Sequence, residues 1–321
     1  MNRIILEVEN LSRYFRVGGL RSKGLLHASE DISFVVHQGE IVALVGESGS
    51  GKSTIARVLA GIYQPTSGEI TFEGQKLRKK PSKKQRGAMP MVFQDPFSSI
   101  NPVFRINHGL DRSLKLHRKE LNKSQRKALA INLVEKVGLT PGAEVLRRYP
   151  HELSGGQRQR LGFAQALASQ PSLILADEPV SMLDVSIRIG LLNVMRDLRD
   201  NEGVSILYIT HDLASARYAA DRMIVLYAGM IVEEGTSEEV VTSPKHPYTR
   251  LLMSTAPDPR LPYVELENPG DLGEPPRVIN PQSGCRFSQR CPLVMEKCHT
   301  NNPVMVQLSV TNRAACFAIE A

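Results

Sequence analysis

Short apolar runs separated by turn residues occupy the first quarter of the chain. Runs of this β-like composition predict strands, the run at 41–45 has the length of a buried strand, and Pro65, Ser67 and Gly68 form a turn signal before the last run. A stretch rich in glycine and basic residues, 18–29, interrupts the series and predicts a loop. Strands are predicted at residues 4–9, 32–37, 40–45 and 69–72.

The apolar spacing changes to a helical period in the middle of the chain. Leucine, isoleucine and valine recur three or four positions apart within residues 105–170, and the Pro141-Gly142 pair breaks this segment. Strands are predicted again at 173–176, 204–209, 223–227 and 230–233, with a helix at 187–201. Because alternating strands and helices build a mostly parallel sheet covered by helices, we predict an α/β fold with an inserted helical block.

Length and composition describe an ordinary globular protein. The 321 residues exceed the usual size of one domain, so a large domain with an appendage is expected. No apolar run approaches the roughly 18–20 residues of a membrane-spanning helix, and the apolar stretch at the N-terminus is too short for a signal peptide. We therefore expect a cytosolic protein unless a partner holds it at a membrane.

The net charge of +7 raises the question of nucleic-acid binding, and a basic run at residues 76–86 sharpens it. A solvated loop is the first interpretation of such a run. Weak attraction to anionic lipid headgroups is the second, because basic residues gain about 1 kcal/mol each near such a surface. The run has no aromatic residue to stack on a base, which argues against single-stranded nucleic acid.

Residues 46–53 match the phosphate-binding pattern GxxxxGK[ST], between a predicted strand and a helix-compatible run. Glycines let successive N–H groups face the phosphates, and the helix N-terminus adds positive potential. Lys52 would reach the β- and γ-phosphates, and the Ser53 hydroxyl would bind Mg²⁺. The predicted nucleotide-binding residues here are Gly46, Ser48, Gly49, Ser50, Gly51, Lys52, Ser53 and Thr54.

Two adjacent carboxylates follow the apolar run 173–176. Asp177 would hold Mg²⁺, usually through water. Glu178 points to the other side of the strand, towards the γ-phosphate, where it would act as the general base on the attacking water. A buried strand that leads into the pair makes a chance surface position a poor explanation.

Residues 153–157 read Leu-Ser-Gly-Gly-Gln and precede a predicted helix at 157–168. Ser154 is a good helix N-cap, and Gly155 and Gly156 allow close approach of the backbone. Together with Gln157 they resemble the signature motif of the ATP-binding-cassette family. The resemblance implies that this helix points at the γ-phosphate bound by an opposite subunit, so that hydrolysis requires a dimer.

The resemblance extends to other positions. Gln94 resembles the glutamine that contacts Mg²⁺ and the attacking water, Asp184 ends a loop at the dimer interface, and His211 resembles the switch histidine of the γ-phosphate. The adenine is expected to stack on an early aromatic ring, with Phe15 preferred and Tyr14 as the competitor. The family fold implied is a P-loop NTPase core with an antiparallel β subdomain and an inserted helical signature subdomain.

Segments 94–102, 148–152 and 246–249 resemble ATPase subunits of oligopeptide and dipeptide importers. This implies an ATPase domain at 1–250, with its helical subdomain at about 95–170, and a C-terminal extension at 251–321. The implied partners are a second, similar ATPase subunit, two transmembrane permease subunits and an extracytoplasmic solute-binding protein. The resemblance also implies that the chain is located at the cytoplasmic face of the inner membrane and that the transported solute is a peptide or an oligosaccharide.

A soluble ATPase that acts on nucleic acid or the ribosome is the alternative function. Such proteins carry either a long coiled coil between the P-loop and the signature or two cassettes in one chain. Only about a hundred residues separate Lys52 from Ser154, without sustained heptads. The chain also has a single cassette, so the importer subunit is preferred.

The four cysteines all lie after residue 284. Cytosolic redox conditions disfavour disulfides, whereas four thiolates suit zinc or an iron–sulfur cluster. The C-terminal pattern resembles that of peptide-importer ATPases, in which it is associated with a 4Fe–4S cluster. We predict this cluster as a structural staple, with zinc or free thiols as the alternatives, at Cys285, Cys291, Cys298 and Cys316.

Overall fold

The computed structural model describes residues 3–18, 24–78, 82–95, 100–255 and 276–319. Its helices are α1 (Lys52–Leu59), α2 (Lys83–Ala88), α4 (Ile106–His117), α5 (Lys123–Lys136), α6 (Gly142–Val145), α7 (Gly155–Leu167), α8 (Val185–Glu202), α9 (Leu213–Ala219), α10 (Ser237–Thr242) and α11 (Pro247–Thr255). Its strands are β1 (Ile4–Val17), β2 (Gly24–His37), β3 (Ile41–Val45), β4 (Ser67–Phe72), β5 (Gln75–Lys76), β6 (Met91–Val92), β7 (Leu173–Asp177), β8 (Ser205–Thr210), β9 (Arg222–Tyr227), β10 (Met230–Thr236), β11 (Val306–Gln307) and β12 (Arg313–Ala314).

A mostly parallel sheet forms the centre of the molecule. Its strand order is β11-β12-β10-β9-β3-β8-β7-β6, and the strands from β9 to β6 run parallel. Strands β3, β7 and β8 are buried along their whole length, as expected where helices cover both faces of a parallel sheet. The carboxyl ends of β3, β7 and β8 meet at one edge, which brings Val45, Asp177 and Thr210 together.

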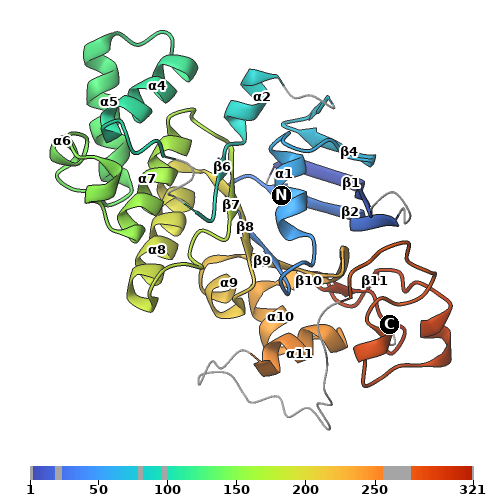
Figure 1. The fold of residues 1–321 in the computed structure, drawn as a ribbon. Coiled ribbons are helices and arrows are strands. Elements are labelled where there is room, and N and C mark those ends of the chain that lie inside the picture. Colours follow the sequence, from blue (N-terminus) through green and yellow to red (C-terminus); the bar gives the residue numbers. More distant parts are fainter. Residues whose placement is uncertain (1–2, 19–23, 79–81, 96–99, 256–275, 320–321) are drawn as a thin grey trace.

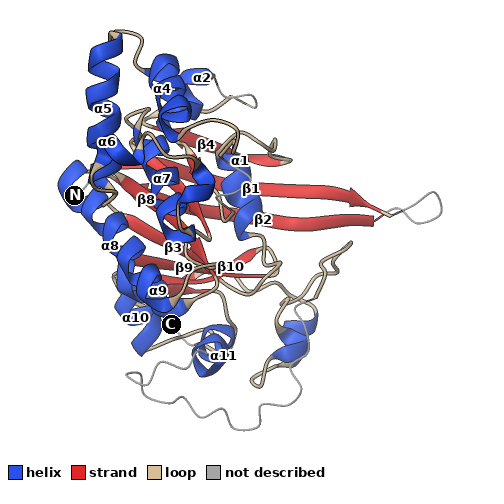
Figure 2. Cartoon of the chain, turned by 60° about the vertical axis from the view of Figure 1, so that its left-hand side comes forward, coloured by secondary structure: helices blue, strands red, loops and turns tan. Residues whose placement is uncertain are grey.

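An antiparallel sheet of order β2-β1-β4-β5 stands beside the central one (Figure 1). The ribbon of β1 and β2 is longer than the sequence predicts, and Figure 2 shows it projecting from the molecule. The loop prediction for residues 18–29 was wrong from residue 24 onwards. Leu25 and Leu26 pair with Arg16 and Phe15, because the strand pairing of the ribbon extends over these polar-flanked positions.

The helical block lies between β6 and β7 in the sequence and gathers at one end of the molecule (Figure 1). Helices α4, α5, α6 and α7 bury their apolar faces in one cluster that includes Leu110, Val134 and Leu161. The predicted helical character of residues 105–170 is confirmed. The loop prediction for the basic run at 76–86 was wrong at residues 83–86, which begin α2, because Ser82 and Gln85 make a capping box.

The C-terminal part joins the central sheet rather than standing apart from it. Strand β12 pairs with β10 at Ala314 and Glu233, and residues 278–280 run along β2. Phe287 is buried against rings of the core. The predicted proline-rich linker falls mainly on residues 256–275, outside the described residues.

Candidate nucleotide site

The phosphate-binding loop connects β3 to α1, as predicted. Gly46, Gly49 and Gly51 all have positive φ, which glycine adopts without strain. The tightest place is Gly51, where a Cβ atom would lie 2.1 Å from the carbonyl oxygen of Ala28. At Gly46 a Cβ atom would approach a backbone oxygen of β9 to 2.2 Å. The loop is therefore wedged between β2 and β9, and only glycine fits at these positions.

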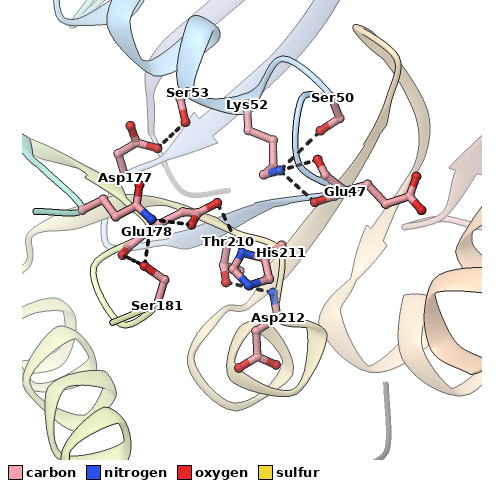
Figure 3. Close-up of polar contacts among 12 residues, drawn as sticks. Glu47, Ser50, Lys52, Ser53, Asp177, Glu178, Ser181, Thr210, His211 and Asp212 are labelled. Atoms are coloured by element: carbon pink, nitrogen blue, oxygen red, sulfur yellow. Dashed lines mark hydrogen bonds and ion pairs between the residues drawn. The ribbon is translucent and has the colours of Figure 1, made fainter. Parts of the chain in front are cut away.

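Lys52 is buried and donates hydrogen bonds back into the loop. Its Nζ atom lies 2.7 Å from the Gly46 oxygen and 2.8 Å from the Glu47 oxygen (Figure 3). Burial lowers the pKa of Lys52 to about 8, while the carboxylates of Glu178 and Asp177 act in the opposite direction. The negative charge of a phosphate in the loop would raise this pKa as these carboxylates do.

Ser53 and Asp177 meet across the site. The Ser53 hydroxyl donates to Asp177 Oδ1 at 2.7 Å, although 124 positions separate them in the sequence. Burial raises the pKa of Asp177. A hydroxyl beside a buried carboxylate fits Mg²⁺, which prefers oxygen ligands and would favour the ionised carboxylate.

Glu178 occupies the centre of the site (Figure 3). Gln94 Nε2 donates to Glu178 Oε2 at 3.2 Å, and His211 Nδ1 lies 3.3 Å from Glu178 Oε1. The backbone of Glu178 has φ of 47°, a left-handed value that is uncommon outside glycine and recurs at functional sites. Two side chains, from the segments that follow β6 and β8, are thus brought to the carboxylate that follows β7.

One contact of this cluster was not predicted as functional. Gln94 Nε2 also donates to Ser181 Oγ at 3.2 Å, and Ser181 Oγ donates to the Glu178 carbonyl at 3.0 Å. Ser181 therefore fixes the glutamine towards the carboxylate. Its place three residues after Glu178 in a tight turn is the sequence signal that could have indicated this.

The signature segment forms a capped helix, as predicted. Ser154 Oγ accepts from the Gln157 N–H at 3.3 Å, and Gln157 Oε1 accepts from the Ser154 N–H at 3.0 Å. Gly156 is needed for packing, because a Cβ atom there would lie 2.2 Å from Cγ2 of Ile187 on α8. Ser154 is exposed, so the helix N-terminus is open to a ligand or a partner.

Asp184 precedes α8 and is exposed, with its side chain making no cap hydrogen bond. The turn that contains it is held by Arg188, which donates to the Leu183 oxygen at 3.4 Å and pairs with Asp212 at 2.8 Å. Asp212 also caps α9. Neither Arg188 nor Asp212 was predicted from the sequence to support the site.

The two aromatic candidates lie on opposite faces of β1, because successive residues of a strand alternate. The Tyr14 ring stacks on His27 with centroids 3.9 Å apart. The Phe15 ring contacts Tyr63 edge-on at 5.3 Å and has the Arg13 guanidinium 4.3 Å away. Both rings are half-exposed, and each has a polar or aromatic neighbour.

The four cysteines lie in one region of the C-terminal part, and none of them is joined in a disulfide. Burial raises the pKa of Cys291 to about 11, and the charges of Cys316, Cys285 and Cys298 add to the effect. Backbone N–H groups point at several of the sulfurs, among them Ala318 to Cys316 Sγ at 3.4 Å. Within the described part of the chain, no three His, Cys, Asp or Glu side chains are placed to bind one metal ion.

Two family models match the chain. The model described as ABC transporter matches residues 29–181, and the model described as oligopeptide/dipeptide transporter, C-terminal region, matches residues 232–298. Among solved structures, the MJ0796 cassette dimer bound to ADP and Pi has a TM-score of 0.64 at 26% identity, covering 73% of this chain and 99% of that one. The cbiO1 structure from Clostridium perfringens also scores 0.64, at 25% identity over 75% of this chain and 92% of that one. The fold and site thus define an ATPase subunit of the ATP-binding-cassette class.

Proteins of similar sequence narrow the functional class of this ATPase subunit. "Probable peptide ABC transporter ATP-binding protein y4tS" of Sinorhizobium fredii is 43% identical over 98% of this chain and 90% of its own length. "Dipeptide transport ATP-binding protein DppF" of Haemophilus influenzae is 40% identical over 99% of this chain and 98% of its own. The chain belongs to the family of ATP-binding proteins of peptide ABC transporters. These relatives do not favour the alternative of a soluble ATPase on nucleic acid or the ribosome.

As a member of this family, the chain is an ATP-binding subunit of an ATP-dependent peptide transporter. Across the described ranges, no helix combines the length and hydropathy that crossing a membrane requires.

Proposed function

We propose that this chain binds and hydrolyses ATP to drive the import of di- or oligopeptides. The observation that supports the chemistry is the convergence of Gln94 and His211 on the Glu178 carboxylate, beside a P-loop lysine. The relatives named for peptide and dipeptide transport support peptides over oligosaccharides as the solute.

The P-loop is proposed to hold the phosphates through its backbone N–H groups and through Lys52. The residues assigned to this role are Gly46, Ser48, Gly49, Ser50, Gly51, Lys52, Ser53 and Thr54. Ser53 and Asp177 would hold Mg²⁺, with Gln94 as a further contact. When bound, the ion neutralises charge that develops on the phosphates.

Glu178 is proposed as the general base that takes a proton from the attacking water. Its side chain is only 16% exposed, and Gln94 and His211 hold its two oxygens from different sides. His211 would also contact the γ-phosphate. These contacts fix the direction of the carboxylate before any nucleotide enters.

Dimerisation is proposed to complete the site. The exposed N-terminus of α7 would meet the γ-phosphate on a second ATPase subunit, and the MJ0796 cassette crystallised as a dimer with ADP and Pi supports such an arrangement. The residues assigned to the shared site are Ser154, Gly155, Gly156, Gln157 and Asp184. A similar but non-identical second subunit is our preferred partner.

Adenine is proposed to stack on Phe15. The opposite side of β1 presents Tyr14, whose ring is already stacked on His27. Loss of nucleotide affinity in Phe15→Ala, with Tyr14→Ala unaffected, is the expected result. The reverse outcome would assign adenine to the tyrosine.

Two permease subunits and an extracytoplasmic solute-binding protein are the further proposed partners, with the chain at the cytoplasmic face of the inner membrane. Reconstitution of this chain with the second ATPase subunit and the permease subunits in vesicles, with the solute-binding protein and labelled dipeptide or trisaccharide supplied outside, tests the solute class. ATP-dependent uptake of the sugar but not of the peptide would contradict the proposal.

A 4Fe–4S cluster on the four cysteines is proposed as a staple of the C-terminal part. The donor chemistry supports it, because buried thiols with N–H groups directed at sulfur suit metal thiolates. Zinc and free thiols are the alternatives. Anaerobic purification, visible absorption and iron, sulfide and zinc analysis of the chain and of Cys291→Ser decide between these.

Glu178→Gln tests the catalytic proposal. Phosphate release by the transporter complex should fall at least about 100-fold, since general-base catalysis supplies that much, while ATP stays bound. Glu202→Gln is the matched control, because Glu202 pairs with Lys136 on the surface away from the site. Phosphate release at the normal rate by Glu178→Gln would refute the assignment of the base.

A further inference from the structure

The segment between Cys285 and Cys291 contacts the P-loop from outside the nucleotide site. Arg290 donates two parallel hydrogen bonds to the Glu47 carboxylate, from Nη1 to Oε2 at 2.8 Å and from Nη2 to Oε1 at 2.9 Å. The Arg290 side chain is only 9% exposed. Paired N–H···O bonds of this kind fix direction as well as distance.

Glu47 is the second residue of the P-loop and joins this contact to the lysine. Its carbonyl oxygen accepts from Lys52 Nζ at 2.8 Å, and its N–H donates to Tyr248 Oη at 2.9 Å. The backbone of Glu47 is therefore held by α1 and α11, and its side chain by Arg290. A shift of Glu47 would therefore move the carbonyl oxygen that accepts the hydrogen bond from Lys52.

Arg290 is itself held in place by a buried ring cluster. Its N–H donates to the Phe287 oxygen at 2.9 Å, and Nη1 lies 3.4 Å from Tyr227 Oη. The rings of Tyr227, Tyr248 and Phe287 pack together with centroids 4.5 to 5.6 Å apart. Because all three side chains are almost fully buried, the guanidinium has a rigid base.

A second arginine of the same segment contacts strand β2 and the turn that follows β9. Arg286 donates to the Ala228 oxygen and pairs with Glu30 on β2. The Glu30 carboxylate also accepts from Tyr14 Oη at 3.3 Å and contacts His27 Nδ1 at 2.9 Å. The segment thus touches both the P-loop and the ribbon that carries the aromatic candidates.

We propose that Arg290 is a positioning residue for nucleotide binding, which holds Glu47 so that the P-loop keeps its phosphate-receiving conformation. Through this contact the affinity for ATP depends on the cysteine-bearing segment. The inference rests on the proposed ATPase function and extends it to the C-terminal part of the chain.

The test measures ATP affinity of the full-length chain in the Glu178→Gln background, where no turnover disturbs the titration. Displacement of a fluorescent ATP analogue by Mg·ATP gives the dissociation constant. Arg290→Ala should weaken ATP binding about tenfold, a size usual for one coupled contact. Arg290→Lys, which keeps the charge but loses the paired geometry, should weaken it by a smaller factor.

A double-mutant cycle separates positioning from general destabilisation. Glu47→Gln should weaken ATP binding much as Arg290→Ala does, and the two changes together should add little to either alone. Arg313→Lys is the matched control, because Arg313 also ties the C-terminal part to the core, through Glu234 on β10, without touching the P-loop. Its ATP affinity should stay within about twofold of the background chain.

Three other outcomes would contradict either the role of Arg290 or the proposed ATPase function. Unchanged ATP affinity in both Arg290 variants, with a lowered urea midpoint, would reduce the ion pair to a structural contact and overturn the inference. Equal weakening by Arg313→Lys would overturn it as well, since attachment alone would then explain the effect. Failure of the Glu178→Gln chain itself to bind ATP would instead refute the proposed function.

Discussion

Acid sensitivity of the fold should depend on His246, the residue just before α11. His246 is 1% exposed, and its Nδ1 atom accepts from the Tyr248 N–H at 3.0 Å. Burial lowers the pKa of His246 from 6.5 to about 3, and the nearby charge of Arg250 acts in the same direction. The folded chain therefore holds this imidazole neutral at any pH that a cell maintains.

The sign of the effect follows from the two protonation states. Between pH 6.5 and about 3 the unfolded chain binds a proton at this position that the folded chain does not. Stability from this residue is thus fully present above pH 6.5 and decreases as the pH falls through that window. The contribution lost between pH 8 and pH 5 is about 2 kcal/mol, and roughly 5 kcal/mol is lost below both pKa values.

Urea unfolding followed by circular dichroism at pH 8 and pH 5 measures this contribution. His246→Asn keeps an acceptor near the position of Nδ1 and removes the titrating group. The variant should be less stable at pH 8 but lose about 2 kcal/mol less than the parent chain on going to pH 5. His108→Asn, at an exposed position of α4, is the control and should follow the parent. An identical pH dependence of parent and His246→Asn would refute the reasoning.

Three further predictions concern the nucleotide site. Gly51→Ala should abolish ATP binding and lower the free energy of unfolding by about 2–3 kcal/mol, because its Cβ would meet the Ala28 oxygen at 2.1 Å; ATP titration and urea unfolding measure this. Gly156→Val should prevent ATP turnover by the complex, since the side chain would collide with Ile187; phosphate release measures it. ATP binding should take up nearly one proton at about pH 9 and little at pH 7, because Lys52 has a pKa of about 8; calorimetry in two buffers measures the uptake.

Neighbouring glycines provide the controls for the first two of these. A Cβ atom at Gly49 would meet nothing within 4 Å, so Gly49→Ala should lose stability only through its positive φ. Gly155→Ala would place a Cβ atom 3.8 Å from a side-chain atom of Leu183, an ordinary contact. Equal damage by the control and the test variant of either pair would contradict the steric argument. Binding heats at pH 9 that do not change with the buffer would contradict the proton uptake at Lys52.

Sequence patterns predicted the local structure of the candidate site where its motifs require fixed residue types over short distances. The P-loop, the Asp177-Glu178 pair and the helix capped by Ser154 all appear as continuous motifs, and the structure places them at the ends of the predicted elements. Local geometry of this kind depends on glycine conformations and capping, which residue identity largely determines.

Long-range contacts could not be read in the same way. The pairing of Arg290 with Glu47 spans 243 positions, and nothing in the residues around either one indicates the other. The extension of β2 back to Gly24 is similar, since residues 24–26 look like a loop until their partners on β1 and at Asn280 are known. Such features depend on the assembled fold, where tertiary pairing overrides local propensity.

The polar groups of the candidate site are hydrogen-bonded to one another. Lys52 Nζ donates to two carbonyl oxygens of the loop, the Ser53 hydroxyl donates to Asp177, and the Gln94 amide donates to Glu178. Each of these contacts occupies an atom that the proposed chemistry assigns to a phosphate, to Mg²⁺ or to the attacking water. Nucleotide binding therefore exchanges internal hydrogen bonds for new ones, and the net gain is smaller than a count of new contacts suggests. In the dimer proposed above, the exposed N-terminus of α7 would supply a further phosphate contact, because a helix N-terminus carries a partial positive charge.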